Sequence, residues 1–189
     1  MKVNGIIAEY NPFHNGHKYQ MDISRQMTGA DYTIVIMSGD FVQRGAPALL
    51  DKHHRAEMAL RCGADLVLGL PAIYSASSAE YFSMGAVSTL DKLGVVTHLC
   101  FGSECGNVEV MTKVAEVLTD EPEDFSATLQ KYMKQGVSYP NARNWAMFHH
   151  YPFLEAYKDV FSTPNNILGI EYIKALLRRN SRMVPVTVR

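Results

Sequence analysis

The sequence predicts an α/β fold, with a Rossmann-like parallel sheet and helices on both of its faces. Residues 3–8 form an apolar run of strand length, and residues 32–37 form a continuous apolar run, as in strands that are buried on both sides. Segments with helical periodicity alternate with such runs, and this order is typical of a parallel sheet with helical crossovers. At 189 residues, the chain is long enough for one domain with a sizeable core.

Local signals justify each element of the first half. The first strand enters a turn rich in Asn, Pro and Gly, and from His17 onward apolar residues recur at spacings of four. Asp51 is a possible cap for the second helix, while Gly63 and Gly94 end the second and third helices. We therefore expect strands at 3–8, 32–37, 64–71 and 95–101, with helices from 17, at 50–61 and at 76–93.

The pattern changes after Gly106. Two amphipathic helices at 108–119 and 125–135 flank an acidic stretch, residues 120–124, which we interpret as a solvated linker and cap. Trp145, the only tryptophan, is expected in the core. The remaining elements are helices at 138–150 and 165–180, and the chain divides into an alternating core at 1–106, a mainly helical part at 107–180 and a last strand at 183–189.

Composition excludes several classes of protein. The formal net charge is −1, so no overall basic field indicates nucleic acid, although a local basic patch remains compatible with it. The three cysteines, without a C-x-x-C pair, argue against a disulfide framework and a structural zinc site. No apolar run approaches membrane-spanning length and no leader is evident, so we expect a cytoplasmic protein without a membrane partner.

The turn after the first strand is the main candidate site. A strand, a tight turn and a helix in succession direct free main-chain N–H groups and the positive end of the helix dipole at one spot, which favours a phosphate. His14 and His17 flank that spot, and Gly16 between them would let a ligand approach the main chain. Imidazoles can donate hydrogen bonds to phosphate oxygens or offset charge on a leaving group. A structural turn with incidental histidines is the alternative.

Further candidates lie where other strands end, because ligands of open α/β sheets bind at the carboxyl ends of the strands. Gln43 and Arg44 follow the second strand in a loop with Gly and Pro, and Gly102 ends the fourth strand. Asn165 precedes an apolar helix and can either cap that helix or hydrogen-bond a ligand. Arginines close to the end of the same helix either complement its negative end or form a phosphate-binding patch; they are Arg178, Arg179 and Arg182.

Longer motifs carry a family resemblance. His14-Asn15-Gly16-His17 after a first apolar strand resembles the H-x-G-H signature of the nucleotidyltransferase superfamily, in which the histidines contact the phosphates of a nucleoside triphosphate. Residues 9–17, 37–45, 101–104 and 164–169 together resemble the bacterial tRNA(Met) cytidine acetate ligase family. Members of that family activate acetate with ATP to acetyl-adenylate and transfer the acetyl group to N4 of the wobble cytidine of elongator tRNA(Met).

The resemblance implies a set of site residues. His14 and His17 would be catalytic, at the phosphates of ATP, and Mg²⁺ would accompany the nucleotide. Family members also continue into a tRNA-binding C-terminal region that this sequence lacks, so the chain resembles the amino-terminal part of a member. The implied ATP-binding residues are Ile7, Ala8, Glu9, Tyr10, Asn11, Pro12, Phe13, His14, Asn15, Gly16, His17, Lys18, Tyr19, Gln20, Gly102, Asn165 and Arg189.

Two other functions remain open from the sequence. A small-molecule adenylyltransferase that makes a nucleotide cofactor would be expected to work as a self-sufficient domain of about this size. A non-catalytic module that binds nucleotide or RNA would fit the absence of the family's second nucleotide signature. The sequence does not identify the ligands of Mg²⁺ or the oligomeric state.

Overall fold

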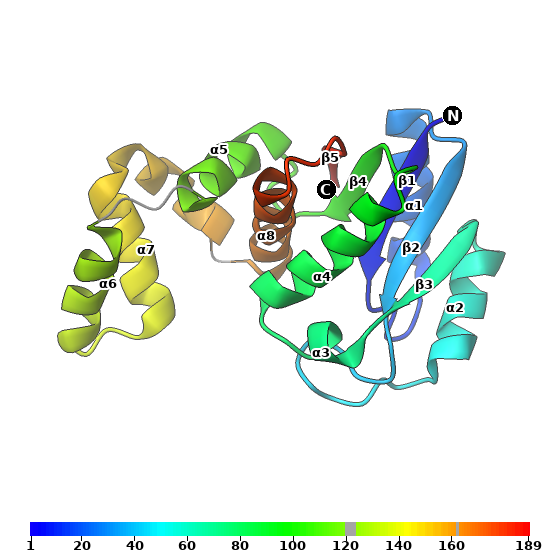
Figure 1. Ribbon diagram of the computed structural model, residues 1–189, viewed down its shortest axis with the longest axis horizontal. Coiled ribbons are helices and arrows are strands. Elements are labelled where there is room, and N and C mark those ends of the chain that lie inside the picture. The colour runs from blue at the N-terminus through cyan, green and yellow to red at the C-terminus, as the bar shows by residue number, and fades with distance from the viewer. Residues whose placement is uncertain (120–123, 162) are drawn as a thin grey trace.

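The computed structural model of the protein describes residues 1–119, 124–161 and 163–189. Its centre is a five-stranded sheet in the order β3-β2-β1-β4-β5, in which every neighbouring pair is parallel (Figure 1). This arrangement confirms the predicted α/β class. The strands are β1 (Val3–Ala8), β2 (Tyr32–Ser38), β3 (Leu66–Leu70), β4 (His98–Gly102) and β5 (Val184–Val188).

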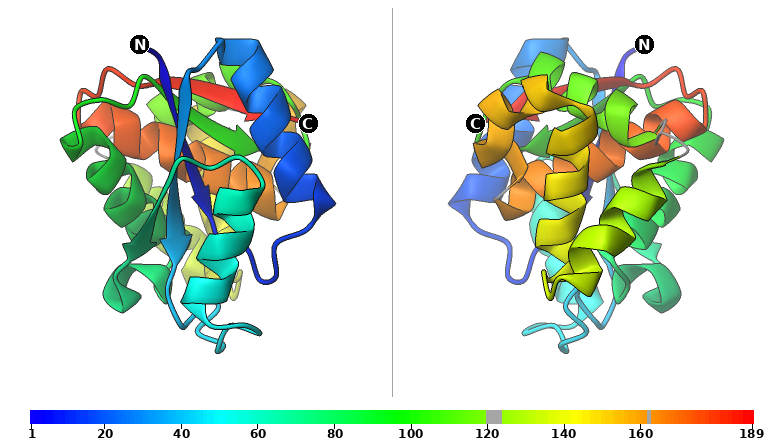
Figure 2. Two further views of the ribbon diagram at one scale, coloured as in Figure 1. Left: turned by 90° about the vertical axis from the view of Figure 1, so that its right-hand side faces the viewer. Right: turned by 90° about the vertical axis from the view of Figure 1, so that its left-hand side faces the viewer.

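Helices cover both faces of the sheet, as the two side views in Figure 2 show. Helices α1 and α2 lie on one face, and α4 and α8 lie on the other. The helices are α1 (Asn15–Thr28), α2 (Lys52–Arg61), α3 (Ala72–Ser75), α4 (Ala79–Lys92), α5 (Val108–Thr119), α6 (Phe125–Lys134), α7 (Tyr139–His150), the 3₁₀ segment η1 (Pro152–Phe161) and α8 (Pro164–Arg178).

Alternation along the strands builds two cores. Ile6 of β1 and Val35 of β2 pack with Met21 of α1 and Ala59 of α2. On the opposite face, neighbouring strand residues such as Ile7 pack with α4, α5 and α8 in a larger cluster. Because successive strand side chains point to opposite faces, a continuously apolar strand supplies both clusters.

Three sequence expectations need correction. The single helix expected at 76–93 is two helices, because the chain breaks after α3 and the Ser78 hydroxyl caps the start of α4. The segment η1 was not expected, and its Tyr157 has non-helical dihedral angles. Trp145 is not in the core, since 49% of its surface is exposed. Of the acidic linker, residues 120–123 lie outside the described residues, and Asp124 occupies the N-cap position of α6 without a side-chain capping bond.

Helices α6 and α7 form a pair at one end of the molecule, away from the sheet (Figure 1). The pair packs mainly on itself, and α7 contacts η1, which in turn contacts α5 and α8. Of the helices in the described ranges, none combines the length and the apolar character needed to cross a membrane. The cysteines Cys62, Cys100 and Cys105 are free thiols.

Candidate nucleotide-binding site

A cleft of about 830 Å³ opens at the carboxyl ends of the strands. Its walls come from the end of β1, the start of α1, the loop after β2, the end of β4, the start of α8 and the end of β5. Strand β1 lies between β2 and β4, so the chain's crossovers diverge to the two sides of β1. Ligands of open α/β sheets bind in the crevice at such a switch point.

His14 and His17 form a reciprocal cap at the start of α1. The His14 Nδ1 atom accepts a hydrogen bond from the Gly16 N–H at 3.1 Å, and the His17 Nδ1 atom accepts one from the His14 N–H at 3.2 Å. The helix therefore begins at Asn15, two residues earlier than expected. The two rings stack with their centroids 3.6 Å apart.

The cap determines what the two imidazoles can offer a ligand. A neutral imidazole has one N–H and one bare nitrogen, so a ring that accepts through Nδ1 carries its proton on Nε2. Burial, reinforced by the neighbouring His14, lowers the pKa of His17 to about 4, which keeps this ring neutral at pH 7. Both Nε2–H groups are thus donors, next to a helix N-terminus whose dipole favours an anion.

Tyr10 packs against the turn between β1 and α1 that carries His14 and His17, here called the histidine turn. Its side chain is buried and its φ angle is 48°, a left-handed conformation that non-glycine residues seldom adopt. The Tyr10 ring packs against the rings of Phe13 and His17, each with centroids 4.8 Å away. These contacts fix the turn between β1 and α1 and hold the His17 ring in place.

Arg55 of α2 joins this turn to the loop after β2. Although the residue is fully buried, its guanidinium has no carboxylate within bonding distance in the described part of the chain. It donates instead to the carbonyl oxygens of Leu50 at 3.0 Å, Glu9 at 2.6 Å and Gly39. The sequence leaves open whether the cations at residues 52–55 form a solvated polar face or have a use, and it does not indicate that Arg55 is buried.

Two further bonds fasten the same loops. The Glu9 carboxylate accepts the Gln43 N–H at 2.7 Å, and the Asn11 side-chain oxygen accepts the Leu49 N–H at 2.6 Å. Gln43 and the exposed Arg44 consequently line the cleft together with the turn that carries His14 and His17. The paired loops thus form one preorganised wall, which reduces the ordering cost of ligand binding.

Another part of the cleft wall, at the start of α8, is held by hydrogen bonds to Glu104. Its carboxylate accepts hydrogen bonds from the main-chain N–H groups of Asn165 and Asn166, at 3.3 and 2.9 Å, and from the Asn165 side-chain amide at 3.0 Å. Burial alone would raise the pKa of the Glu104 carboxyl, but the hydrogen bonds that this carboxylate accepts, those from the Asn165 and Asn166 N–H groups among them, together outweigh burial and the pKa lies below its ordinary value. Glu104 therefore caps α8, and the expectation that Asn165 could be the cap is wrong; Thr163 occupies the N-cap position.

The cleft brings together most of the residues expected to hold ATP. Phe13, Asn15 and Lys18 do not line it, and Lys18 forms an ion pair with Asp22 at 2.6 Å. Arg178 and Arg179 lie elsewhere, paired with Glu80 and Asp91. The expected residues that do line the cleft are Ile7, Ala8, Glu9, Tyr10, Asn11, Pro12, His14, Gly16, His17, Tyr19, Gln20, Gly102, Asn165 and Arg189.

Comparison with known proteins assigns the family. The family model described as HIGH Nucleotidyl Transferase matches residues 1–189. The chain belongs to this nucleotidyltransferase family. Its relatives include the tRNA(Met) cytidine acetate ligases of Clostridium kluyveri, 48% identical, and Halothermothrix orenii, 50% identical. Each match covers 100% of the chain but only 48% and 46% of the relative, so the chain spans about half the length of these curated relatives.

Two solved structures are also similar to this chain over its whole length. Thermotoga maritima TmcAL bound with alpha-thio ATP superimposes with a TM-score of 0.92 at 43% identity. The apo form of the same protein gives a TM-score of 0.93 at 42% identity. Both matches cover 100% of this chain, and 46% and 45% of the solved chains.

Proposed function

We propose that this chain carries the ATP-dependent, acetate-activating site of a tRNA(Met) cytidine acetate ligase. The main observation is the histidine turn, where two Nε2–H donors lie beside a helix N-terminus in the strand-end cleft. The names of the relatives, and the ATP analogue bound to the Thermotoga protein, support the same function. The whole reaction belongs to a longer protein, which works on tRNA in the cytoplasm.

In the first step, an acetate oxygen attacks the α-phosphorus of ATP. The bond from this phosphorus to the bridging oxygen of the β-phosphate breaks, and pyrophosphate leaves with the electron pair. His14 and His17 donate to phosphate oxygens and stabilise the charge that develops on the leaving group. In the second step, N4 of the wobble cytidine attacks the acetyl carbon, loses one proton and displaces AMP.

The remaining cleft residues bind and orient the nucleotide. Gly102 lets it approach the end of β4, Asn165 is held in place by Glu104, and Arg189 provides a positive charge beside β5. Holding the acetate oxygen in line with the α-phosphorus supplies most of the rate acceleration expected from proximity. The other residues of the expected ATP-binding set remain part of this proposal, including Phe13, Asn15 and Lys18, which do not line the cleft.

Mg²⁺ belongs to the proposal as the ion that accompanies ATP. Within the described ranges, no group of three or more His, Cys, Asp and Glu side chains is arranged to hold a metal. Glu9 lines the cleft and offers carboxylate oxygens, which hard divalent cations prefer. When bound, the ion would neutralise part of the phosphate charge, with Glu9 as its protein ligand.

Isotope exchange between pyrophosphate and ATP tests the activation step. We expect exchange only when acetate is present, in this chain or in a full-length relative measured beside it. Exchange that is indifferent to acetate in both proteins would contradict the proposal. Exchange that requires a phosphorylated cofactor precursor would favour a small-molecule adenylyltransferase, and ATP binding without exchange in the full-length protein would favour a non-catalytic module.

A further inference from the structure

The pair of helices α6 and α7 has an unusual composition. Residues 125–154 contain no Asp or Glu, whereas they include three Lys or Arg and seven aromatic residues. The chain as a whole has a formal net charge of −1, so positive charge is concentrated here and offset elsewhere. Basic residues interleaved with aromatic side chains are typical of surfaces that bind single-stranded nucleic acid.

The aromatic side chains are presented to solvent. Trp145 is 49% exposed, and Tyr132 packs against it with ring centroids 5.5 Å apart and an interplanar angle of 86°. Tyr139, at the start of α7, and Phe153, at the start of η1, are 56% and 54% exposed. An indole that is oriented by a neighbour and still half open to solvent can stack on a base with little additional ordering.

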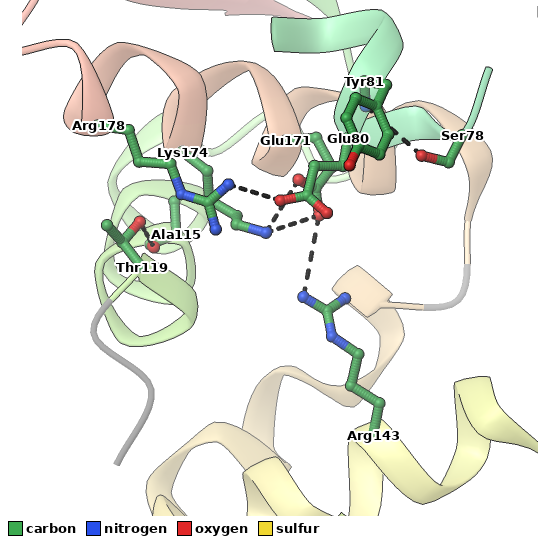
Figure 3. Close-up of polar contacts among 9 residues, drawn as sticks. All are labelled: Ser78, Glu80, Tyr81, Ala115, Thr119, Arg143, Glu171, Lys174 and Arg178. Carbon is green, nitrogen blue, oxygen red and sulfur yellow. Dashed lines mark hydrogen bonds and ion pairs between the residues drawn. The ribbon is translucent and has the colours of Figure 1, made fainter. Parts of the chain in front are cut away.

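The cations of the pair divide into two groups. Arg143 points back to the body of the protein, where it lies 4.0 Å from Glu171, beside the buried Lys174–Glu171 ion pair (Figure 3). Arg143 therefore anchors α7 to α8. Lys131 and Lys134, in contrast, are exposed in the last turn of α6 and form no ion pair with any described residue.

Asp124, the described acidic residue immediately before α6, lies too far along the helix to cancel the charge of these lysines. With a rise of about 1.5 Å per residue, Lys131 and Lys134 stand roughly 10 and 15 Å along the axis from Asp124. Charges separated by more than a Debye length, about 8 Å at physiological salt, are largely screened from one another. The far end of α6 thus keeps its positive charge.

We propose that the side chains of Lys131, Lys134, Tyr132, Tyr139 and Trp145, here called the α6–α7 surface, bind a single-stranded loop of RNA. The bases stack on Trp145 and Tyr139, and the two lysines contact phosphates. The choice of RNA as the partner rests on the proposed function, whereas the surface itself follows from its charge and its exposed rings. No described acidic side chain belongs to this surface.

Trp145 makes the test direct, because it is the only tryptophan in the chain. The probe is an RNA hairpin with a cytidine-containing single-stranded loop, titrated into the 189-residue chain at low salt. We expect quenching of tryptophan fluorescence that follows the same binding curve as the anisotropy of labelled RNA. A blunt RNA duplex without a loop should bind more weakly and quench less.

Substitutions then assign the contacts. The double variant Lys131→Gln, Lys134→Gln should weaken RNA binding at least about tenfold and reduce the slope of log Kd against log salt by about 1.4. Trp145→Ala should weaken binding roughly five- to hundredfold, while Trp145→Phe should keep most of it. The matched control is Arg61→Gln, Lys92→Gln, which removes two exposed cations from the last turns of α2 and α4.

Each outcome has a meaning. Loss of RNA binding in the α6–α7 variants but not in the control, with Mg-ATP binding unchanged in all of them, supports the proposal. RNA binding that these substitutions leave unchanged, or the absence of RNA binding by this chain, overturns the proposal. So does a Trp145 signal that changes with protein concentration but not with RNA, since it would indicate a protein interface. Acetate-dependent exchange is measured separately, so the proposed function can stand when this surface fails.

Discussion

The guanidinium of Arg55 lies 2.6 Å from the carbonyl oxygen of Glu9, 46 residues earlier in the chain. Through this bond and a second one to Gly39, helix α2 holds the end of β1, which lines the cleft, to the start of the loop after β2, whose residues 42–44 also line it. Arg55 does not line the cleft. Its role is to position the main chain from which the histidine turn departs.

We expect Arg55→Met to lower the free energy of unfolding by about 2–4 kcal/mol, because it leaves several buried carbonyl groups without a donor. ATP binding should weaken about tenfold in the fraction that remains folded. Urea unfolding and calorimetric titration of Mg-ATP measure the two effects. Arg55→Lys should recover part of both, and Arg61→Met, on the exposed side of the same helix, should change neither. Unchanged ATP affinity in folded Arg55→Met would refute the positioning role.

His14 caps α1, and in the proposed function it also binds phosphate; two substitutions can separate these roles. Asn is among the best N-cap residues, so His14→Asn should keep the stability of the parent, while His14→Ala should lose about 1 kcal/mol. Neither variant retains the Nε2–H donor. Both should therefore lose Mg-ATP affinity to the same extent, roughly tenfold, or about 1.4 kcal/mol. If calorimetry finds that His14→Asn binds Mg-ATP as tightly as the parent does, His14 acts only as a helix cap.

Protonation of His17 should make the protein sensitive to acid. The pKa of His17 is lowered to about 4 in the folded protein, against about 6.5 in an unfolded chain. The unfolded state binds more protons between these values, so stability is complete above pH 6.5 and is lost progressively as the pH falls toward 4. Because pH also acts on other groups of the protein, a matched variant is necessary.

His17→Gln supplies that variant. Gln at this position of a helix can accept the N-cap N–H, as in a capping box, and it does not titrate. We expect the difference in urea midpoint between parent and His17→Gln to change steadily from pH 6.5 to 4.5, with the parent losing more. A constant difference across this range would show that His17 is not held neutral by its surroundings.

The sequence was sufficient for features that depend on neighbouring residues. The strand-turn-helix at His14 and His17, and the alternation that produces a parallel sheet, are both local patterns. The buried guanidinium of Arg55 could not be predicted, because its acceptors come from three separate segments and its sequence context is a run of basic residues. The same holds for Trp145, whose exposure depends on α6 and α7 packing away from the main body.

The last prediction concerns Glu104 and the part of the cleft wall at the start of α8. Its carboxylate caps a helix that begins about 60 residues later and orients Asn165 toward the cleft. Glu104→Ala should cost about 1–2 kcal/mol of stability through the lost cap, and Glu104→Gln less, because one oxygen acceptor remains. Since the pKa of Glu104 is lowered on folding, its contribution is present at neutral pH and disappears as the pH falls through the folded pKa.

The matched control for Glu104 is Glu109→Ala, which removes an exposed carboxylate from the first turn of α5. Both substitutions take a negative charge from a helix start, so their difference isolates the hydrogen bonds to α8. We expect Glu109→Ala to lose no more than about 0.5 kcal/mol and to bind Mg-ATP like the parent. Glu104→Ala should also weaken Mg-ATP binding, because Asn165 loses the partner that fixes its amide. Equal ATP affinities in the two variants would mean that α8 keeps Asn165 in place without Glu104.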